Sequence, residues 1–133
     1  MSTRKLIILD DEEMMLKSLE RRFKSETTEY DLCCFTSIKD ALEELEQGEC
    51  YAFITDVKMP LLNGDQVVGY IKQKYPEQDC LVITGQAEKD EIQRIIQVGN
   101  VKSILSKPLE FEKLLEALDA ISNPPEDDES GEK

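Results

Sequence analysis

The chain has 133 residues, of which 40% are hydrophobic, and this composition suits one globular domain with a buried core. Its 16 Lys and Arg residues against 29 Asp and Glu residues give a net charge of −13. This charge argues against direct binding to nucleic acid or to an anionic membrane, so we expect protein partners and small ions. The sequence contains no histidine, and its four cysteines show no CxxC spacing, which excludes an imidazole-based triad and argues against a zinc site.

The first predicted element is a strand over residues 5–9, followed by the four acids Asp10, Asp11, Glu12 and Glu13. This apolar run is too short for the core of a signal peptide or for a membrane span. The cysteines are expected to be small buried side chains that stay reduced, as in the cytoplasm. We therefore expect a soluble, cytoplasmic protein. Asp10 or Asp11 could cap the helix that follows, and the glutamates could complement its dipole, but capping needs one acid rather than four.

Helical and strand patterns alternate along the rest of the chain. After the first helix, a more polar strand is predicted over residues 30–35, and Ser37 is expected to cap a second helix that ends at Gly48. Further strands are predicted over residues 51–55, 80–83 and 101–105. The remaining helices are marked by apolar residues at helical spacing: Val67, Val68, Ile71 and Tyr75; Ile92, Ile95 and Ile96; Phe111, Leu114, Leu115, Leu118 and Ile121. We expect the last two sets in the core.

This fivefold alternation predicts a doubly wound α/β fold, with a five-stranded parallel sheet, helices on both faces and right-handed crossovers. In such folds ligands bind beyond the carboxyl ends of the strands. The residues predicted at those ends are Asp10 and Asp11 after the first strand, Asp56 after the third, Thr84 after the fourth and Lys107 after the fifth. We therefore expect them to share one edge of the sheet.

Three carboxylates at one edge repel each other by about 3 kcal/mol per pair at about 5 Å and an effective dielectric near 20. Three such pairs approach a domain's whole stability of about 5–15 kcal/mol, so a compensating cation is expected. Lys107 can supply one charge, and an all-oxygen ligand set favours Mg²⁺. A metal beside a lysine and a hydroxyl suits phosphate, and a carboxylate nucleophile can form an aspartyl-phosphate.

The site residues stand in recognisable stretches: Asp10-Asp11, ITDVKMPLLNG around Asp56, LVITG from Leu81 and ILSKPLE around Lys107. Together they resemble the receiver domain of two-component response regulators, over residues 4 to 122. The resemblance implies a flavodoxin-like sheet with strand order 2-1-3-4-5, the order of a well-known member of this family. It further implies a receiver domain over residues 1–122, whereas the acidic residues 123–133 are expected to form a disordered tail or linker.

By this resemblance, Asp56 is the phosphoacceptor and takes its phosphoryl group from the phosphohistidine of a sensor histidine kinase or a phosphotransfer protein. Asp11 and Asp56 would bind Mg²⁺ directly, Asp10 would help through water, and the backbone carbonyl of Lys58 would complete the protein ligands. Such a domain is regulatory and is not an enzyme, beyond assisting its own phosphorylation and dephosphorylation.

The resemblance also assigns Lys107 to one phosphoryl oxygen and the Thr84 hydroxyl to another. The added charge would then bias the face made by the fourth helix, the fifth strand and the fifth helix, which would contact a downstream protein or effector domain or a second copy of the chain. Two departures bear on this relay. Ile104 stands where the family usually has an aromatic switch residue, and Gly99-Asn100 replaces the usual Gly-Ala.

Lys58 and Gln86 occupy positions that tune the lifetime of the phosphoryl group in the family, and we hypothesise that the Lys58 cation approaches that group. Two alternative functions remain open. One is a receiver-like interaction module that no longer accepts phosphate, which Ile104 leaves open. The other is a Mg²⁺-dependent phosphohydrolase with an aspartyl nucleophile. Those resembling the haloacid dehalogenase family carry a second acid two residues after the nucleophile, where this chain has Lys58.

Overall fold

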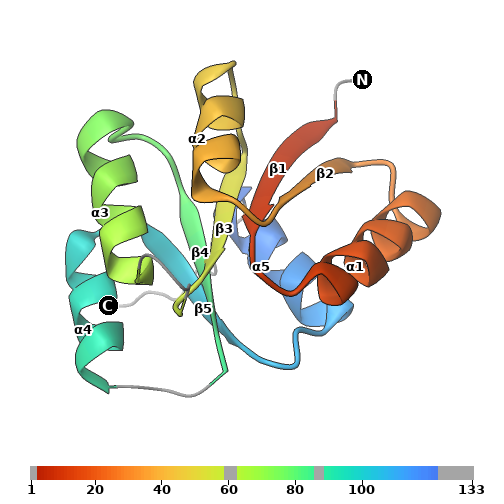
Figure 1. The fold of residues 1–133 in the computed structure, drawn as a ribbon. Coiled ribbons are helices and arrows are strands. Elements are labelled where there is room, and N and C mark those ends of the chain that lie inside the picture. The colour runs from red at the N-terminus through yellow and green to blue at the C-terminus, as the bar shows by residue number, and fades with distance from the viewer. Residues whose placement is uncertain (1–2, 59–62, 86–88, 123–133) are drawn as a thin grey trace, which may run out of the picture.

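The computed structural model describes residues 3–58, 63–85 and 89–122, in which five strands alternate with five helices (Figure 1). The predicted tail over residues 123–133 lies outside this described part, as does Gln86. The strands are β1 (Arg4–Leu9), β2 (Tyr30–Phe35), β3 (Ala52–Asp56), β4 (Cys80–Thr84) and β5 (Val101–Ser106). The helices are α1 (Glu13–Glu26), α2 (Ile38–Glu46), α3 (Gly64–Lys74), α4 (Lys89–Val98) and α5 (Phe111–Ser122).

The five strands form one parallel sheet in the order β2-β1-β3-β4-β5, which confirms the predicted fold class and strand order. Every residue of β3 and of β4 is buried. This is the pattern expected of strands covered on both faces, where aliphatic side chains leave water on either side. The edge strand β2 is more polar and partly exposed, as its sequence indicated.

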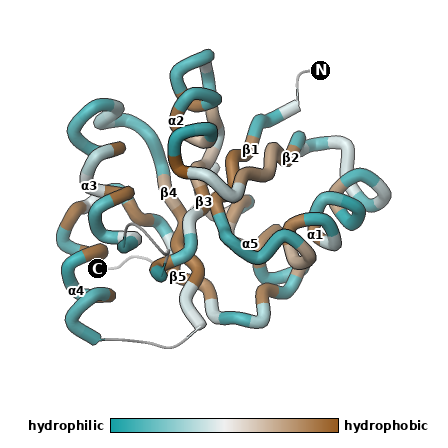
Figure 2. Tube along the Cα trace, in the orientation of Figure 1, coloured by the Kyte–Doolittle hydropathy of each residue, from teal (hydrophilic) through white to brown (hydrophobic). Residues whose placement is uncertain are grey.

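Helices cover both faces of the sheet. Along β1, Leu6 and Ile8 belong to a core with α1 and α5, whereas Ile7 and Leu9 belong to a core with α2, α3 and α4. Neighbouring residues of one strand thus serve opposite layers, because side chains alternate across a strand. In Figure 2 hydrophobic residues gather on the strands, while many residues of the helices are hydrophilic. Among the helices described, none is long and apolar enough to cross a bilayer.

The ends of the helices show which polar residues serve local structure. The Ser37 hydroxyl accepts a hydrogen bond from the Asp40 N–H at 3.4 Å and caps α2, as predicted. At α1 the cap position is Glu12, whose side chain makes no capping bond. The prediction that Asp10 or Asp11 could occupy the cap position is therefore wrong. These acids precede the helix and remain available for another role.

One predicted core residue lies at the surface. Ile95 of α4 is fully buried, but the neighbouring Ile96 is 56% exposed. Consecutive helical residues point about 100° apart, so the face that presents Ile95 to the sheet turns Ile96 away from it. The cysteines also differ from expectation in part, because Cys80 is buried whereas Cys33, Cys34 and Cys50 are half-buried. All four are free thiols, and burial raises the pKa of Cys80 to about 12.

Candidate functional site

The carboxyl ends of four strands meet at one edge of the sheet, and the predicted site residues stand there. Asp10 follows β1 directly, Asp56 is the last residue of β3, Thr84 is the last residue of β4, and Lys107 follows β5. The strand order places β1, β3, β4 and β5 next to one another. Residues separated by up to 97 positions in the sequence are therefore brought together by the topology alone.

The acidic cluster consists of Asp10, Asp11 and Asp56. Each offers one carboxylate oxygen, and these oxygens all lie within 4.8 Å of one another. Within residues 3–58, 63–85 and 89–122, no other group of three or more Cys, Asp or Glu side chains has this arrangement. Asp10 is fully buried and Asp56 is 4% exposed, whereas Asp11 is exposed. The cluster is thus a partly buried concentration of negative charge that is open to solvent on the side of Asp11.

Lys107 supplies a positive charge to this cluster. Its Nζ donates a hydrogen bond to Oδ2 of Asp56 at 2.8 Å and lies 3.5 Å from Oδ2 of Asp10. It also lies 3.6 Å from Oε1 of Glu12, a contact that the sequence pattern does not predict. Burial alone would lower the pKa of the Lys107 ammonium, but the hydrogen bond to Asp56 and the charge of Asp10 raise it above the usual value. Lys107 therefore stays charged at neutral pH.

Asp10 shows that one ammonium does not satisfy the whole cluster. Its Oδ1 accepts a hydrogen bond from the Glu12 N–H at 2.9 Å, but its buried Oδ2 has no hydrogen-bond partner in the described part of the chain. Burial raises the pKa of the Asp10 carboxyl, and the nearby charge of Asp56 raises it further. A buried carboxylate oxygen that accepts no hydrogen bond and lies 3.5 Å from its ammonium, beside two other carboxylates, belongs to a set of hard oxygen donors that fits a divalent cation such as Mg²⁺.

The loop after β3 holds the Asp56 carboxylate from the other side. The backbone N–H of Lys58 donates to Oδ1 of Asp56 at 3.3 Å, and the Val57 N–H donates to the carbonyl of Ile83 in β4. At the start of α3, a Cβ on Gly64 would lie 2.9 Å from the Cα of Val57. Because real Cβ atoms do not approach so closely, only glycine allows α3 to pack this tightly against the end of β3.

Three other predicted residues, Thr84, Lys58 and Ile104, occupy the expected positions in the fold. The Lys107 N–H donates to the backbone carbonyl of Thr84 at 2.9 Å, so β4 and β5 remain paired up to the site. Thr84 is 9% exposed. Ile104 is half-buried and packs against the core beneath α2, α3 and α4. The phosphate-binding role of the Thr84 hydroxyl and the metal-binding role of the Lys58 carbonyl stay predictions.

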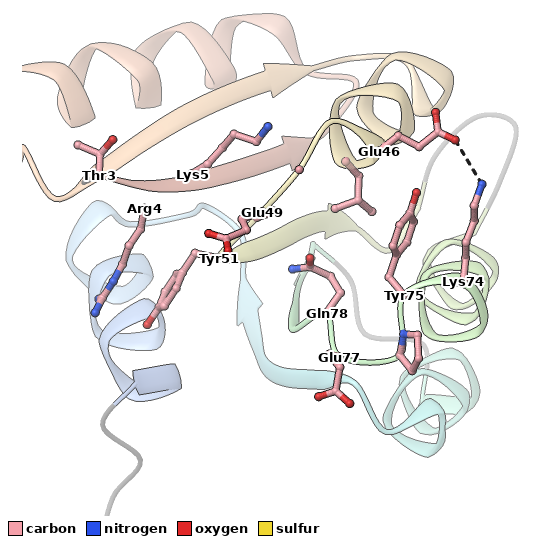
Figure 3. Close-up of a pocket in the computed structure, with 14 residues that line it drawn as sticks. Thr3, Arg4, Lys5, Glu46, Glu49, Tyr51, Lys74, Tyr75, Glu77 and Gln78 are labelled. Atoms are coloured by element: carbon pink, nitrogen blue, oxygen red, sulfur yellow. Dashed lines mark hydrogen bonds and ion pairs between the residues drawn. The ribbon is translucent and has the colours of Figure 1, made fainter. Parts of the chain in front are cut away.

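A hollow of about 1150 Å³ lies at the opposite edge of the sheet, where the strands begin (Figure 3). Its lining carries charges of both signs, including Lys74, whose Nζ lies 3.4 Å from Oε2 of Glu46. None of the three clustered aspartates lines it. The hollow is therefore separate from the candidate site.

Five parallel strands in this order, alternating with five helices, are the fold of CheY-like receiver domains. Among solved structures, the signal receiver domain of an HD domain-containing protein from Pseudomonas fluorescens Pf-5 superposes with a TM-score of 0.83. It is 24% identical in sequence, and the match covers 92% of this chain and 96% of the other. The beryllofluoride-activated NtrC4 receiver domain dimer matches at a TM-score of 0.78 and 25% identity, covering 88% and 94%.

The sequence model of the response regulator receiver domain matches residues 6–119. The chain therefore belongs to the family of response regulator receiver domains. The response regulator protein TodT of Pseudomonas putida is 28% identical over 115 residues, a match that covers 86% of this chain and 49% of TodT. The chain thus spans about half the length of this curated relative.

Proposed function

We propose that Asp56 accepts a phosphoryl group from the phosphohistidine of a sensor histidine kinase or a phosphotransfer protein, in a Mg²⁺-dependent reaction. A carboxylate oxygen of Asp56 attacks the phosphorus, and a new P–O bond forms as the P–N bond to the histidine breaks. The imidazole leaves with the electron pair of that bond and takes up a proton. The product is an aspartyl-phosphate, which water later hydrolyses to restore the carboxylate.

One observation carries this proposal: a receiver-family chain places the oxygens of Asp10, Asp11 and Asp56 within 4.8 Å of one another, with the Lys107 ammonium 2.8 Å from Asp56. The ammonium lies where it can neutralise a phosphoryl oxygen carried by Asp56. Thr84, at the end of the neighbouring strand, is proposed to hydrogen-bond another phosphoryl oxygen. Asp56 itself is the central acid because it ends the middle strand of the sheet.

The acidic cluster also fits the metal that we propose for it. Asp11 and Asp56 would bind Mg²⁺ directly, Asp10 would bind through water, and the Lys58 carbonyl would complete the set. The buried Oδ2 of Asp10, which accepts no hydrogen bond in the described residues, supports this assignment, because a cation would relieve its desolvation. When bound, Mg²⁺ supplies neutralisation of the charge on the transferring phosphoryl group.

We propose that the output surface is the face made by α4, β5 and α5, which would contact a downstream protein or effector domain. Ile96 of α4 supports this choice, because it is 56% exposed and available for contact. We propose the same face for a homodimer; the NtrC4 receiver domain, whose structure is described as a dimer, supports self-association of such a domain without specifying the face. With a net charge of −13, the domain would signal through proteins rather than bind nucleic acid itself.

The test is to incubate the full chain with acetyl phosphate and Mg²⁺ and to measure its intact mass. We expect one added phosphoryl group, which EDTA and Asp56→Asn both abolish. Asp90→Asn, which changes an exposed acid of α4, is the control and should still be phosphorylated. Phosphate that persists in Asp56→Asn would contradict the assignment, and a protein that takes up none would favour the interaction-module alternative. Sustained turnover of a phosphomonoester would instead favour the phosphohydrolase.

A further inference from the structure

Glu91 is a buried acid on α4, close to the candidate site but outside the acidic cluster. It is 6% exposed, and its Oε1 accepts no hydrogen bond from the described residues. A buried carboxylate in this condition is destabilising unless a cation compensates its charge. Its place in the sequence does not single it out, because an acid in the first turn of a helix is explained by the helix dipole.

A cation beside Glu91 is provided by Lys58, whose Nζ lies 4.0 Å from Oε1 of Glu91. Lys58 belongs to the loop that follows β3, and its backbone N–H donates to Oδ1 of Asp56 at 3.3 Å. The backbone of this lysine therefore lies next to the proposed phosphoacceptor while its ammonium lies next to α4. The Lys58 side chain is flexible and 59% exposed, so its ammonium can change direction without disturbing the core.

We propose that Glu91 is a positioning residue for the phosphorylation site. It holds the Lys58 ammonium toward α4 while Asp56 carries no phosphate, and it yields that ammonium to the phosphoryl oxygens once Asp56 is phosphorylated. This inference rests on the proposed phosphorylation of Asp56 and adds a control on how long the phosphate remains.

The exchange follows from the charges involved. A phosphoryl group carries about −1.5 to −2 charges and three acceptor oxygens, whereas the Glu91 carboxylate carries one charge. The 4.0 Å separation between Lys58 and Glu91 is also longer than a hydrogen bond, so this contact is easier to give up than the 2.8 Å contact of Lys107. Because the phosphoryl group and Glu91 compete for the Lys58 ammonium, each weakens the binding of that ammonium to the other, and by the same factor.

The direction of the effect follows from the chemistry of phosphate loss. Water attacks the phosphorus, the bond to the Asp56 oxygen breaks with its electron pair going to the carboxylate, and inorganic phosphate leaves. In a loose transition state, negative charge moves from the phosphoryl oxygens toward the leaving carboxylate. An ammonium paired with the phosphoryl oxygens therefore stabilises the aspartyl-phosphate more than the transition state. By holding Lys58 back, Glu91 shortens the lifetime of the phosphate.

The experiment is to phosphorylate the full chain with acetyl phosphate and Mg²⁺, remove the donor, and follow the loss of phosphate by intact mass. Glu91→Gln is expected to slow this loss about threefold, a change within the range of an ion pair in which one partner, here Lys58 at 59%, is exposed to solvent. In a Lys58→Met background the same substitution should have no effect, because no ammonium is left to release. Should Glu91→Gln not fold, Glu91→Met provides a second variant that removes the charge.

The ion pair between Arg94 and Asp65 offers a matched control. Arg94 Nε lies 3.1 Å from Oδ2 of Asp65, and this contact also joins α4 to α3, which lie side by side in Figure 1. Arg94→Gln loosens α4 without touching Lys58, so it should leave the rate unchanged. The proposal is overturned if Glu91→Gln leaves the rate unchanged or raises it, acts equally in the Lys58→Met background, or is matched by Arg94→Gln. A wild-type chain with no phosphate on Asp56 overturns the proposed function as well.

Discussion

Replacing Lys107 by methionine tests whether this lysine is the cation that holds the acidic cluster together. The substitution keeps an unbranched side chain of similar length and removes only the charge. Asp10 and Asp56 would then remain buried without their ammonium. We expect a large loss of stability in the absence of metal, because like charges would face each other with less compensation.

The magnitude follows from the distances. At 2.8 Å and an effective dielectric near 20, the attraction between Lys107 and Asp56 is about 6 kcal/mol before the cost of desolvation is counted. Breaking a buried ion pair by removing one partner costs about 3 to 5 kcal/mol in practice. The Asp56 side chain is 6% exposed and that of Lys107 is 22% exposed, so this range applies here.

Urea unfolding at pH 7 in EDTA measures the effect, and Lys5→Met is the matched control. Lys5 has a similar exposure of 23% and lies 2.7 Å from a single partner, Glu44, which is itself 29% exposed. A half-exposed pair of this kind is worth about 1 kcal/mol or less. We therefore expect Lys107→Met to lower the free energy of unfolding several times more than Lys5→Met.

The result that would refute this reasoning is a Lys107→Met variant that loses no more stability than Lys5→Met. The reasoning also requires the loss to shrink at low pH, because the unpaired carboxyls can then bind protons in the folded protein. Combining Lys107→Met with Asp10→Asn should restore part of the stability, since the double substitution removes one of the two buried charges. A variant that responds to neither change would show that the lysine acts through packing alone.

Other substitutions test single features of the structure. Asp10→Asn should raise the stability of the metal-free protein by about 1 to 3 kcal/mol at pH 7. The pKa of Asp10 is raised in the folded protein, so its charge destabilises the fold at pH 7 but not below the pKa of the unfolded chain. The stability gained by Asp10→Asn should therefore vanish as the pH falls to 3.5, and urea titrations at both pH values check this. Gly64→Ala should cost about 1 to 3 kcal/mol by chemical denaturation and slow phosphorylation, whereas Gly69→Ala, with open space around its Cβ, should gain about 0.5 to 1. Ile95→Ala should cost about 2 to 5 kcal/mol in thermal unfolding, and Ile96→Ala should stay within about 0.5 of wild type; equal losses would place both side chains in the core.

The fold could be predicted because its strong signals are local. Aliphatic runs such as residues 80–83 are too short for helices, and the segments between them repeat apolar residues at helical spacing. Alternation of this kind leaves a parallel sheet with helices on both faces as the natural solution. The strand order itself was taken from the family resemblance, because alternation alone does not fix which strands are neighbours.

The site could be predicted as far as it depends on strand ends. Asp10, Asp56 and Lys107 were placed correctly at one edge because each follows or ends a strand of a parallel sheet. The contact of Glu12 with Lys107 was missed, since a lysine side chain reaches several acids and the sequence does not say which. Glu91 was missed because its burial depends on how α4 packs, and an acid in a first helical turn gives no other signal.

Ile96 was misplaced for a related reason. Apolar residues at positions 92, 95 and 96 fit one helical face, and the sequence does not reveal how wide the buried stripe is. α4 buries Ile95 completely and Ile92 in part, which leaves no space against the sheet for Ile96. Exposed apolar residues such as Ile96 can form contacts with partner proteins. The core prediction for Ile96 was wrong because apolar residues serve both core packing and partner contacts.

The burial of β3 along its whole length decides how the domain can respond to a new charge. Asp56 is the last residue of a strand held between β1 and β4, with packed side chains above and below it. Shifting that strand would open voids in both layers, which a close-packed interior resists. If Asp56 is modified, β3 therefore keeps its position. The groups that rearrange are the long side chains around the carboxyl end of the sheet. The signal would then be a change in which of these side chains pair with one another, while the sheet stays the same.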